Sequence, residues 1–100
     1  MTPKEVLIAA RQLIADEKRW VKKVLTSVNK DGERCYCANG AIIAAIGPPE
    51  EATKLPVYTK ATWALQKAVG GSISLYNDAE TTTHKDILSA FDKAIGELNA

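Results

Sequence analysis

The chain of 100 residues has the length of one compact domain, and we expect a single domain over residues 1–100. Its hydrophobic fraction of 46% is ordinary for a soluble protein, and no apolar run approaches the roughly 20 residues that a membrane helix needs. A net charge of +1 excludes a strong electrostatic field over the whole molecule.

The N-terminal segment and the two cysteines favour a cytoplasmic location. Glu5, Arg11 and Asp16 interrupt the apolar stretch near the N-terminus, a pattern that a secretory signal does not have. Only one residue separates Cys35 from Cys37, so a bridge between them would be strained and would close no useful loop. We therefore expect a cytoplasmic protein with two reduced, partly buried thiols.

A capping box predicts that the first helix begins after Thr2. Pro3 suits the first helical position, and Glu5 follows Thr2 at the spacing of a capping box. Apolar residues then recur at helical spacing, namely Val6, Ala10, Leu13 and Ile14. The charged residues 16–19 favour an end or a bend of this helix, although an apolar stripe in residues 20–25 would allow it to continue.

The next segment, residues 24–37, predicts either a small β-hairpin or an irregular loop. Val24, Thr26 and Val28 alternate with their neighbours as in a strand, and residues 29–32 have the composition of a turn that ends in a glycine. An isolated two-stranded ribbon is marginally stable, so a hairpin here would have to pack against the helices.

Two helices are predicted in the middle of the chain. Residues 38–46 are apolar almost all round, which is typical of a short buried helix, and Gly47 ends it. A brief helical turn is expected over residues 50–55. The apolar spacing in residues 61–69 then predicts a longer helix that ends at the pair Gly70–Gly71.

The last quarter of the chain predicts an extended segment followed by a helix. Ile73 and Leu75 alternate with serines, so we expect an extended backbone that buries both side chains. Thr83 and Asp86 form a second capping-box pattern. The helix that follows has the apolar stripe Ile87, Leu88, Phe91, Ala94, Ile95 and Leu98. The fold class predicted is mainly α: a compact bundle of about four helices, with a small β-hairpin near residues 24–37 as the alternative to a loop.

Patterns that indicate an enzyme or a metalloprotein are weak. Cys37 stands at the expected start of a helix, where the helix dipole lowers the pKa of a thiol, and His84 with Asn77 or Asp78 could complete a catalytic arrangement. The competing interpretation is that Cys37 packs as a small apolar side chain, and this one is favoured. The single His and the Cys-x-Cys pair lack the second ligand pair of a zinc site, so we expect no metal, no cofactor and no catalytic residue.

Two aromatic segments suggest binding surfaces. Residues 18–23 combine four basic side chains with Trp20, as in some nucleic-acid-binding proteins, although the same pattern fits a solvated stretch anchored to the core. Trp63 and Tyr58 lie at the margin of a helix whose core face is filled by alanine and leucine. They belong either to the rim of the core or to a binding surface, and the sequence does not separate the two.

Short motifs over residues 20–95 are similar to those of a known family. The matching residues are Trp20, Gly32, Cys37, Gly40, Ala41, Asn77, Asp78, Ile87 and Ala94. Their order resembles that of a family of small proteins of unknown function from actinobacteria, other bacteria and their phages, in which W, G, C-x-x-GA, ND, T, L and A recur. Tyr36 and Tyr76 stand where the family usually has tryptophan, so both positions keep an aromatic ring. The resemblance implies a fold and a bacterial or phage setting, and it implies no activity.

If the family pattern holds, its two signatures, residues 36–41 and residues 76–78, are expected to meet in space. In the favoured interpretation Tyr76 packs against Gly40 and Ala41, while the polar side chains that follow it satisfy backbone groups. In the alternative, an aromatic ring, an amide and a carboxylate line a pocket for a small ligand such as a nucleotide. The residues in question are Trp20, Tyr36, Cys37, Asn39, Gly40, Tyr76, Asn77 and Asp78.

These observations favour a small interaction protein of phage or mobile-element origin that binds another protein or itself. We expect a homodimer, formed through the terminal helices or through the face that contains Tyr58 and Trp63, with Phe91 of the last helix as a further interface residue. A small-ligand binder is the alternative, and nucleic-acid binding through residues 18–23 is the least favoured partner class.

Overall fold

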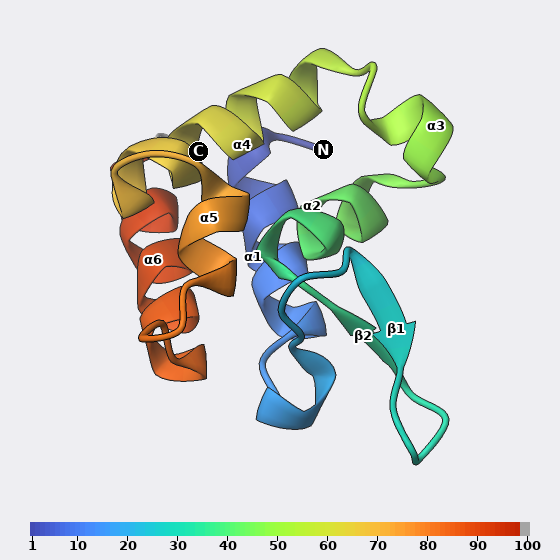
Figure 1. Ribbon diagram of the computed structural model, residues 1–100. Coiled ribbons are helices and arrows are strands. Elements are labelled where there is room, and N and C mark those ends of the chain that lie inside the picture. Colours follow the sequence, from blue (N-terminus) through green and yellow to red (C-terminus); the bar gives the residue numbers. More distant parts are fainter. Residues whose placement is uncertain (99–100) are drawn as a thin grey trace.

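Helices dominate the computed structural model, which describes residues 1–98 (Figure 1). Four longer helices enclose one apolar core, and a two-stranded hairpin extends from the bundle beside the second of them (Figure 1). The elements are α1 (Pro3–Leu13), η1 (Glu17–Arg19), β1 (Thr26–Val28), β2 (Arg34–Tyr36), α2 (Ala38–Ile46), α3 (Pro49–Ala52), α4 (Pro56–Val69), α5 (Ile73–Asp78) and α6 (His84–Glu97). The mainly α-helical prediction is confirmed, and so is the hairpin.

The terminal helices α1 and α6 begin with the two predicted capping boxes. The Thr2 hydroxyl accepts a hydrogen bond from the Glu5 backbone N–H at 3.1 Å, and the Glu5 carboxylate accepts one from the Thr2 N–H at 2.8 Å. Thr83 and Asp86 repeat this exchange at 3.1 and 2.9 Å. Each exchange satisfies two backbone donors that have no partner within the helix.

Helices α1 and α6 run antiparallel and contact each other. The His84 Nε2 at the start of α6 lies 2.6 Å from the carbonyl oxygen of Ile14, the residue that ends α1. Both helices also contact α4, so their apolar faces are buried within one chain. The buried side chains of the core are Val6, Leu7, Ala10, Ile14, Ala38, Ala41, Ile42, Ala61, Ala64, Leu65, Ile73, Ile87, Ala90, Phe91 and Ala94.

The segment between α1 and α2 changes direction twice. α1 ends at Leu13, and Asp16 caps the single turn η1 by accepting a hydrogen bond from the Lys18 N–H. The chain then enters the antiparallel hairpin, in which Ser27 lies opposite Cys35. Its turn contains Gly32 at a φ of +80°, a left-handed conformation that favours glycine.

The extended segment predicted around Ile73 and Leu75 is wrong: these residues form the short helix α5. The hydroxyl of Ser72 accepts a hydrogen bond from the Leu75 N–H at 3.2 Å and thereby caps a helical turn. Helical geometry places the two side chains on different sides, so Ile73 is buried while Leu75 is 76% exposed. The alternation of apolar residues and serines was therefore a misleading strand pattern.

Candidate functional site

Asn77 occupies the centre of the region that the sequence motifs single out. Its side chain has no exposed surface, and all four of its hydrogen-bonding positions are used. The Oδ1 accepts from the Trp20 indole N–H at 2.7 Å and from the Ala38 backbone N–H at 3.0 Å. The Nδ2 donates to the Val21 carbonyl and to the Asp78 carboxylate, both at 3.0 Å. This amide therefore joins α5 to the start of α2 and to the chain that leads into the hairpin.

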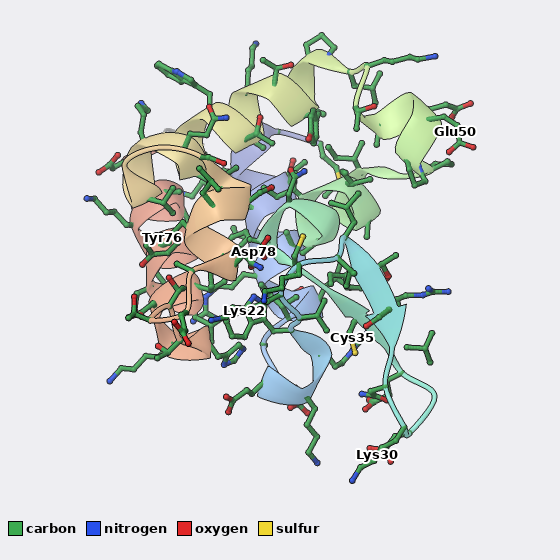
Figure 2. All side chains as sticks on the ribbon, viewed as in Figure 1. Lys22, Lys30, Cys35, Glu50, Tyr76 and Asp78 are labelled. Carbon is green, nitrogen blue, oxygen red and sulfur yellow. The ribbon has the colours of Figure 1, made fainter. Side chains whose placement is uncertain are left out.

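Asp78 and Lys22 form further hydrogen bonds between α5 and the chain that leads into the hairpin. The Asp78 carboxylate accepts a hydrogen bond of 2.7 Å from the backbone N–H of Lys23, a residue held at a φ of +71°. This backbone bond holds the pKa of Asp78 below its usual value. The Lys22 Nζ donates to the Ala79 carbonyl at 2.7 Å. Asn77 and Asp78 consequently brace the left-handed turn at Lys23, with Asp78 and Lys22 close together in Figure 2.

Trp20 is half-buried beside His84 rather than presented to solvent as a free ring. The two ring centroids are 5.8 Å apart with planes inclined at 45°, and the Lys22 ammonium lies 5.5 Å from the indole centroid. The nearby Arg19 Nε donates to the Arg34 carbonyl at 3.0 Å. Two of the four basic side chains in residues 18–23 thus bond to the protein itself.

Cys37 caps α2 with a buried thiol. Its sulfur accepts a hydrogen bond from the Gly40 N–H at 3.3 Å, and the side chain is 5% exposed. Burial raises the pKa of this thiol, and the Gly40 bond offsets that effect only in part. This result agrees with the favoured interpretation, in which Cys37 packs as a small apolar side chain, because desolvation of the thiolate outweighs the hydrogen bonds from backbone N–H groups. Cys35 is also buried and free.

Gly40 allows the hairpin to approach α2 closely. A Cβ atom at this position would overlap the carbonyl oxygen of Leu25. The same carbonyl accepts a hydrogen bond from the Cys37 N–H at 3.2 Å, which ties the start of β1 to the start of α2. The spacing of Cys37 and Gly40 in the motif is thus the spacing that this contact requires.

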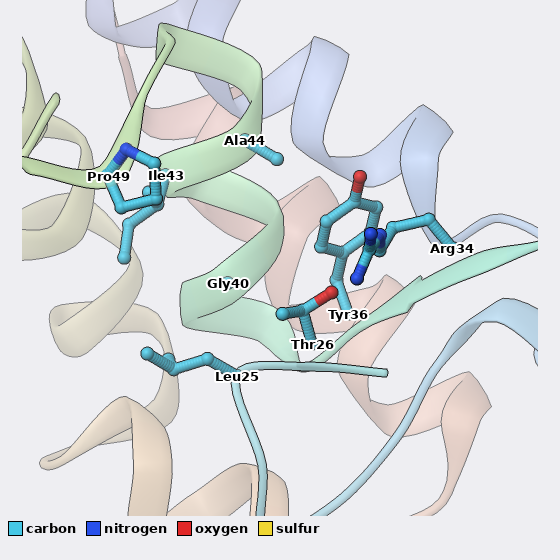
Figure 3. Close-up of a pocket in the computed structure, with 8 residues that line it drawn as sticks. All are labelled: Leu25, Thr26, Arg34, Tyr36, Gly40, Ile43, Ala44 and Pro49. Carbon is cyan, nitrogen blue, oxygen red and sulfur yellow. The ribbon is translucent and has the colours of Figure 1, made fainter. Parts of the chain in front are cut away.

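A largely apolar groove of about 270 Å³ lies on the face of the hairpin next to α2 (Figure 3). It is lined by Leu25, Thr26, Arg34, Tyr36, Gly40, Ile43, Ala44 and Pro49. Figure 3 shows Ile43 beside Pro49 on one side, Leu25 below them across a gap, and Tyr36 near Thr26 and Arg34 on the other side. Leu25, which lines this hairpin groove, is 52% exposed, and Val24 and Val28 on the same stretch of chain are 49% and 55% exposed.

A second, more polar cavity of about 240 Å³ lies between α4, α5 and the start of α2. Tyr58 and Asn39 line it and are bonded to each other, because the Tyr58 hydroxyl donates to the Asn39 Oδ1 at 3.0 Å. Trp63, which is 60% exposed, lies elsewhere on α4, with the Lys67 Nζ 3.9 Å from its ring centroid. Of the two roles left open by the sequence, Tyr58 thus lies at the rim of the core, whereas Trp63 lies on the surface.

The structure brings together some of the predicted site residues and separates others. The two motif segments do meet, since Asn77 bonds to the backbone of Ala38. Tyr36 and Gly40 line the hairpin groove, whereas Tyr76 is half-buried on α5 and packs against the core. Phe91 is fully buried in the core, which leaves it no surface to offer to a partner.

The exposed apolar residues beside the groove were missed by reasoning from the sequence. The alternation of residues 24–28 predicts a strand, but the sequence contains no sign of which face of that strand would be covered. One signal for this exposed surface is the alternation of Val24, Thr26 and Val28. Residues 33–37 are the only other segment with a strand pattern nearby, so the sequence offers no third strand to cover the hairpin. Each outer edge of a two-stranded hairpin is uncovered unless another segment packs against it.

Within residues 1–98, no group of three or more His, Cys, Asp and Glu side chains has the arrangement of a metal site. The His84 Nε2 lies 2.6 Å from the Ile14 carbonyl oxygen and the Cys37 sulfur accepts from the Gly40 N–H, and among residues 1–98 no hydrogen bond joins Cys37 to His84. Among residues 1–98, none of the helices combines the length and the hydropathy that crossing a membrane requires.

Comparison with known proteins identified one relationship. The model of a family of unknown function, DUF6197, matches residues 1–97. Neither a curated protein nor a solved structure matches the chain.

Proposed function

The chain belongs to the family of unknown function DUF6197, and we propose that it is a protein–protein interaction module that binds its partner through the hairpin groove. The observation that carries this proposal is a largely apolar groove lined in part by the half-exposed Leu25, together with two more half-exposed apolar side chains on the same stretch of chain, Val24 and Val28. Apolar surface of this kind, exposed in a small domain, is characteristic of a binding surface.

A small-ligand role in the Asn77 region has less support. Asn77 is buried and uses every donor and acceptor within the chain, and the Asp78 carboxylate already accepts hydrogen bonds from Lys23 and Asn77. Polar groups that are satisfied in this way gain little from a ligand. A cytoplasmic location forms part of the proposal and is supported by the two free, buried cysteines.

Photocrosslinking in cells that produce the protein tests the proposal. A benzophenone side chain would be introduced at Val28 in one variant and at Leu75 in another, because both residues are exposed and lie on different elements. We expect irradiation to yield an adduct with one defined protein from position 28 and none from position 75. Substitution of Leu25 by Glu, which places a charge in the groove, should abolish that adduct. Equal adducts from both positions, or none from position 28, would contradict the proposal.

A further inference from the structure

The two edges of the hairpin differ in whether their backbone groups have partners. On the outer edge of β2, the Tyr36 carbonyl accepts a hydrogen bond from the Val21 N–H at 3.1 Å. The Arg34 carbonyl on the same edge accepts one from the Arg19 Nε at 3.0 Å. The chain that enters the hairpin therefore closes this edge itself.

The outer edge of β1 is open. The bonds from Asn29 N–H to Glu33 and from Cys37 N–H to Leu25 mark the positions of β1 whose backbone faces β2. Because these positions alternate in an antiparallel pair, the N–H and C=O groups of Thr26 and Val28 point away from β2. No hydrogen bond within residues 1–98 reaches them on that side. Such a row of unpaired groups is a template for another extended chain.

The open edge and the hairpin groove lie together. Thr26, Arg34 and Tyr36 have side chains on one face of the hairpin, and that face forms one wall of the groove. A strand added beside β1 would direct every second side chain towards this face, as strands do. Apolar side chains at those positions would meet Leu25 and Val28, which are half exposed in the free protein.

Charge indicates what the added strand should carry. Residues 18–37 contain six basic side chains and two acidic ones, a net charge of +4, whereas the whole chain has a net charge of only +1. The remaining 80 residues therefore have a net charge of −3. The hairpin and its approach are the basic end of the molecule, and acidic groups on a partner would be attracted to it.

We propose that the open edge of β1 receives an extended acidic segment of a partner protein as a third strand, with alternate apolar side chains over the hairpin groove. This proposal rests on the proposed function and specifies its partner. Main-chain hydrogen bonds to Thr26 and Val28 supply the attachment, and the groove selects the side chains. A nucleic acid would also be attracted by the charge, but it has no backbone N–H groups to pair with a strand edge, and Trp20 is enclosed by His84 and Lys22.

Hydrogen exchange measured by NMR tests the proposal on the intact protein. The probe is a capped heptapeptide of alternating glutamate and valine. We expect it to slow exchange of the Thr26 and Val28 amide protons by at least about tenfold, because both become hydrogen-bonded. The amide of Ser27, which already faces β2, should change much less. Binding without protection at Thr26 and Val28, or no binding at all, would overturn the edge-pairing proposal.

Changes to the probe separate backbone pairing from charge. Methylation of alternate peptide nitrogens along one edge should weaken binding at least about tenfold, while methylation along the other edge has little effect. A peptide of alternating lysine and valine should bind at least about fivefold more weakly at low salt. An oligothymidylate should leave the hairpin resonances in place; if it shifts them as strongly as the acidic peptide, the basic end is a nucleic-acid surface and the proposal is wrong.

A matched pair of variants at Val28 tests whether binding of the acidic peptide needs the backbone N–H of this residue. Val28→Pro removes an N–H that does not bond to β2, so the hairpin can persist while affinity for the acidic peptide falls at least about tenfold. Val28→Thr keeps the N–H and the branched shape and should bind within about threefold of the original protein. If the crosslink from position 28 is found but Val28→Pro binds the peptide normally, the interaction function stands and strand addition fails.

Discussion

At the scale of single residues, Asn77 has the clearest role. Its buried amide bonds to two chain segments that are far from it in the sequence, one at Trp20 and Val21 and the other at Ala38. A buried polar group is costly without partners, and this one has all of them within the chain. The fold therefore accounts for the asparagine of the motif. No other side chain of this size offers two acceptor and two donor positions in one plane.

Substitution of Asn77 by Ala should destabilise the protein by about 1–3 kcal/mol, because it leaves the Trp20 and Ala38 donors buried without acceptors. Thermal unfolding would report this as a fall of roughly 5–20 °C in Tm. Trp20→Phe removes only the indole donor and should cost less. An unchanged Tm for Asn77→Ala would refute the structural interpretation of the motif and favour a ligand site.

Gly40 and Gly96 form a natural pair for testing the close approach of the hairpin. Gly40→Ala forces the Leu25 carbonyl away from α2 and should destabilise the fold by about 1–3 kcal/mol. Gly96 lies in α6 with open space around it, so Gly96→Ala should stabilise by about 0.5–1 kcal/mol. Denaturant titration measures both free energies of unfolding. Two substitutions of equal effect would show that the contact at Gly40 is unimportant.

At the scale of elements, carboxylates bonded to backbone N–H groups secure three sites: the starts of α1 and α6 and the turn at Lys23. In each, the hydrogen bond from the backbone lowers the pKa of the carboxyl group, which belongs to Glu5, Asp86 or Asp78. A group whose pKa is lower in the folded state stabilises the protein above its unfolded pKa. That stabilisation disappears as the pH falls through the folded value.

Stability should consequently decline as the pH falls below about 4, the range in which unfolded Asp and Glu side chains take up protons. Asp78→Asn removes one of the three contributions, so the difference in Tm between pH 6 and pH 3 should be smaller by about 2–4 °C. Asp31→Asn in the hairpin turn is the control, because within residues 1–98 the Asp31 carboxylate accepts no hydrogen bond. Equal pH profiles for Asp78→Asn and the original protein would contradict the assignment.

At the scale of the whole molecule, the apolar stripe of α6 is covered within one chain. Ile87, Phe91 and Ala94 are buried, and α6 contacts both α1 and α4. The width of this stripe therefore no longer supports a dimer through the terminal helices. On the other predicted surface, Trp63 on α4 remains exposed, covered in part by Lys67.

We expect any homodimer to form through this face of α4, since Trp63, at 60% exposure, is the largest exposed aromatic side chain in residues 1–98. Size-exclusion chromatography with light scattering should give a dimer mass at micromolar concentration. Trp63→Glu should restore the monomer, whereas Leu75→Glu, at a still more exposed position on α5, should not. A monomer mass for the original protein throughout the micromolar range would exclude self-association.

The sequence by itself determined where several helices and turns of this protein begin and end. The capping boxes at Thr2 and Thr83, the glycine that ends α2 and the hairpin turn at Gly32 all lie where the sequence predicts them. These features depend on hydrogen bonds and backbone conformations within a few residues, so their signals are readable without the fold. The error at Ile73 and Leu75 arose because the same residues fit a strand pattern and a capped helical turn.

Only the tertiary structure decided what the motif residues do and where the surface is open. Contacts such as that between Asn77 and Trp20 span more than 50 residues, and no local pattern encodes them. The exposure of Val28 and the burial of Cys37 depend on which elements cover them, and burial in turn sets the pKa of the thiol. The outer edge of β1 is open because the chain that enters the hairpin bonds to β2 instead. The position of that chain depends on the packing of Trp20 against His84 and on its hydrogen bond to Asn77.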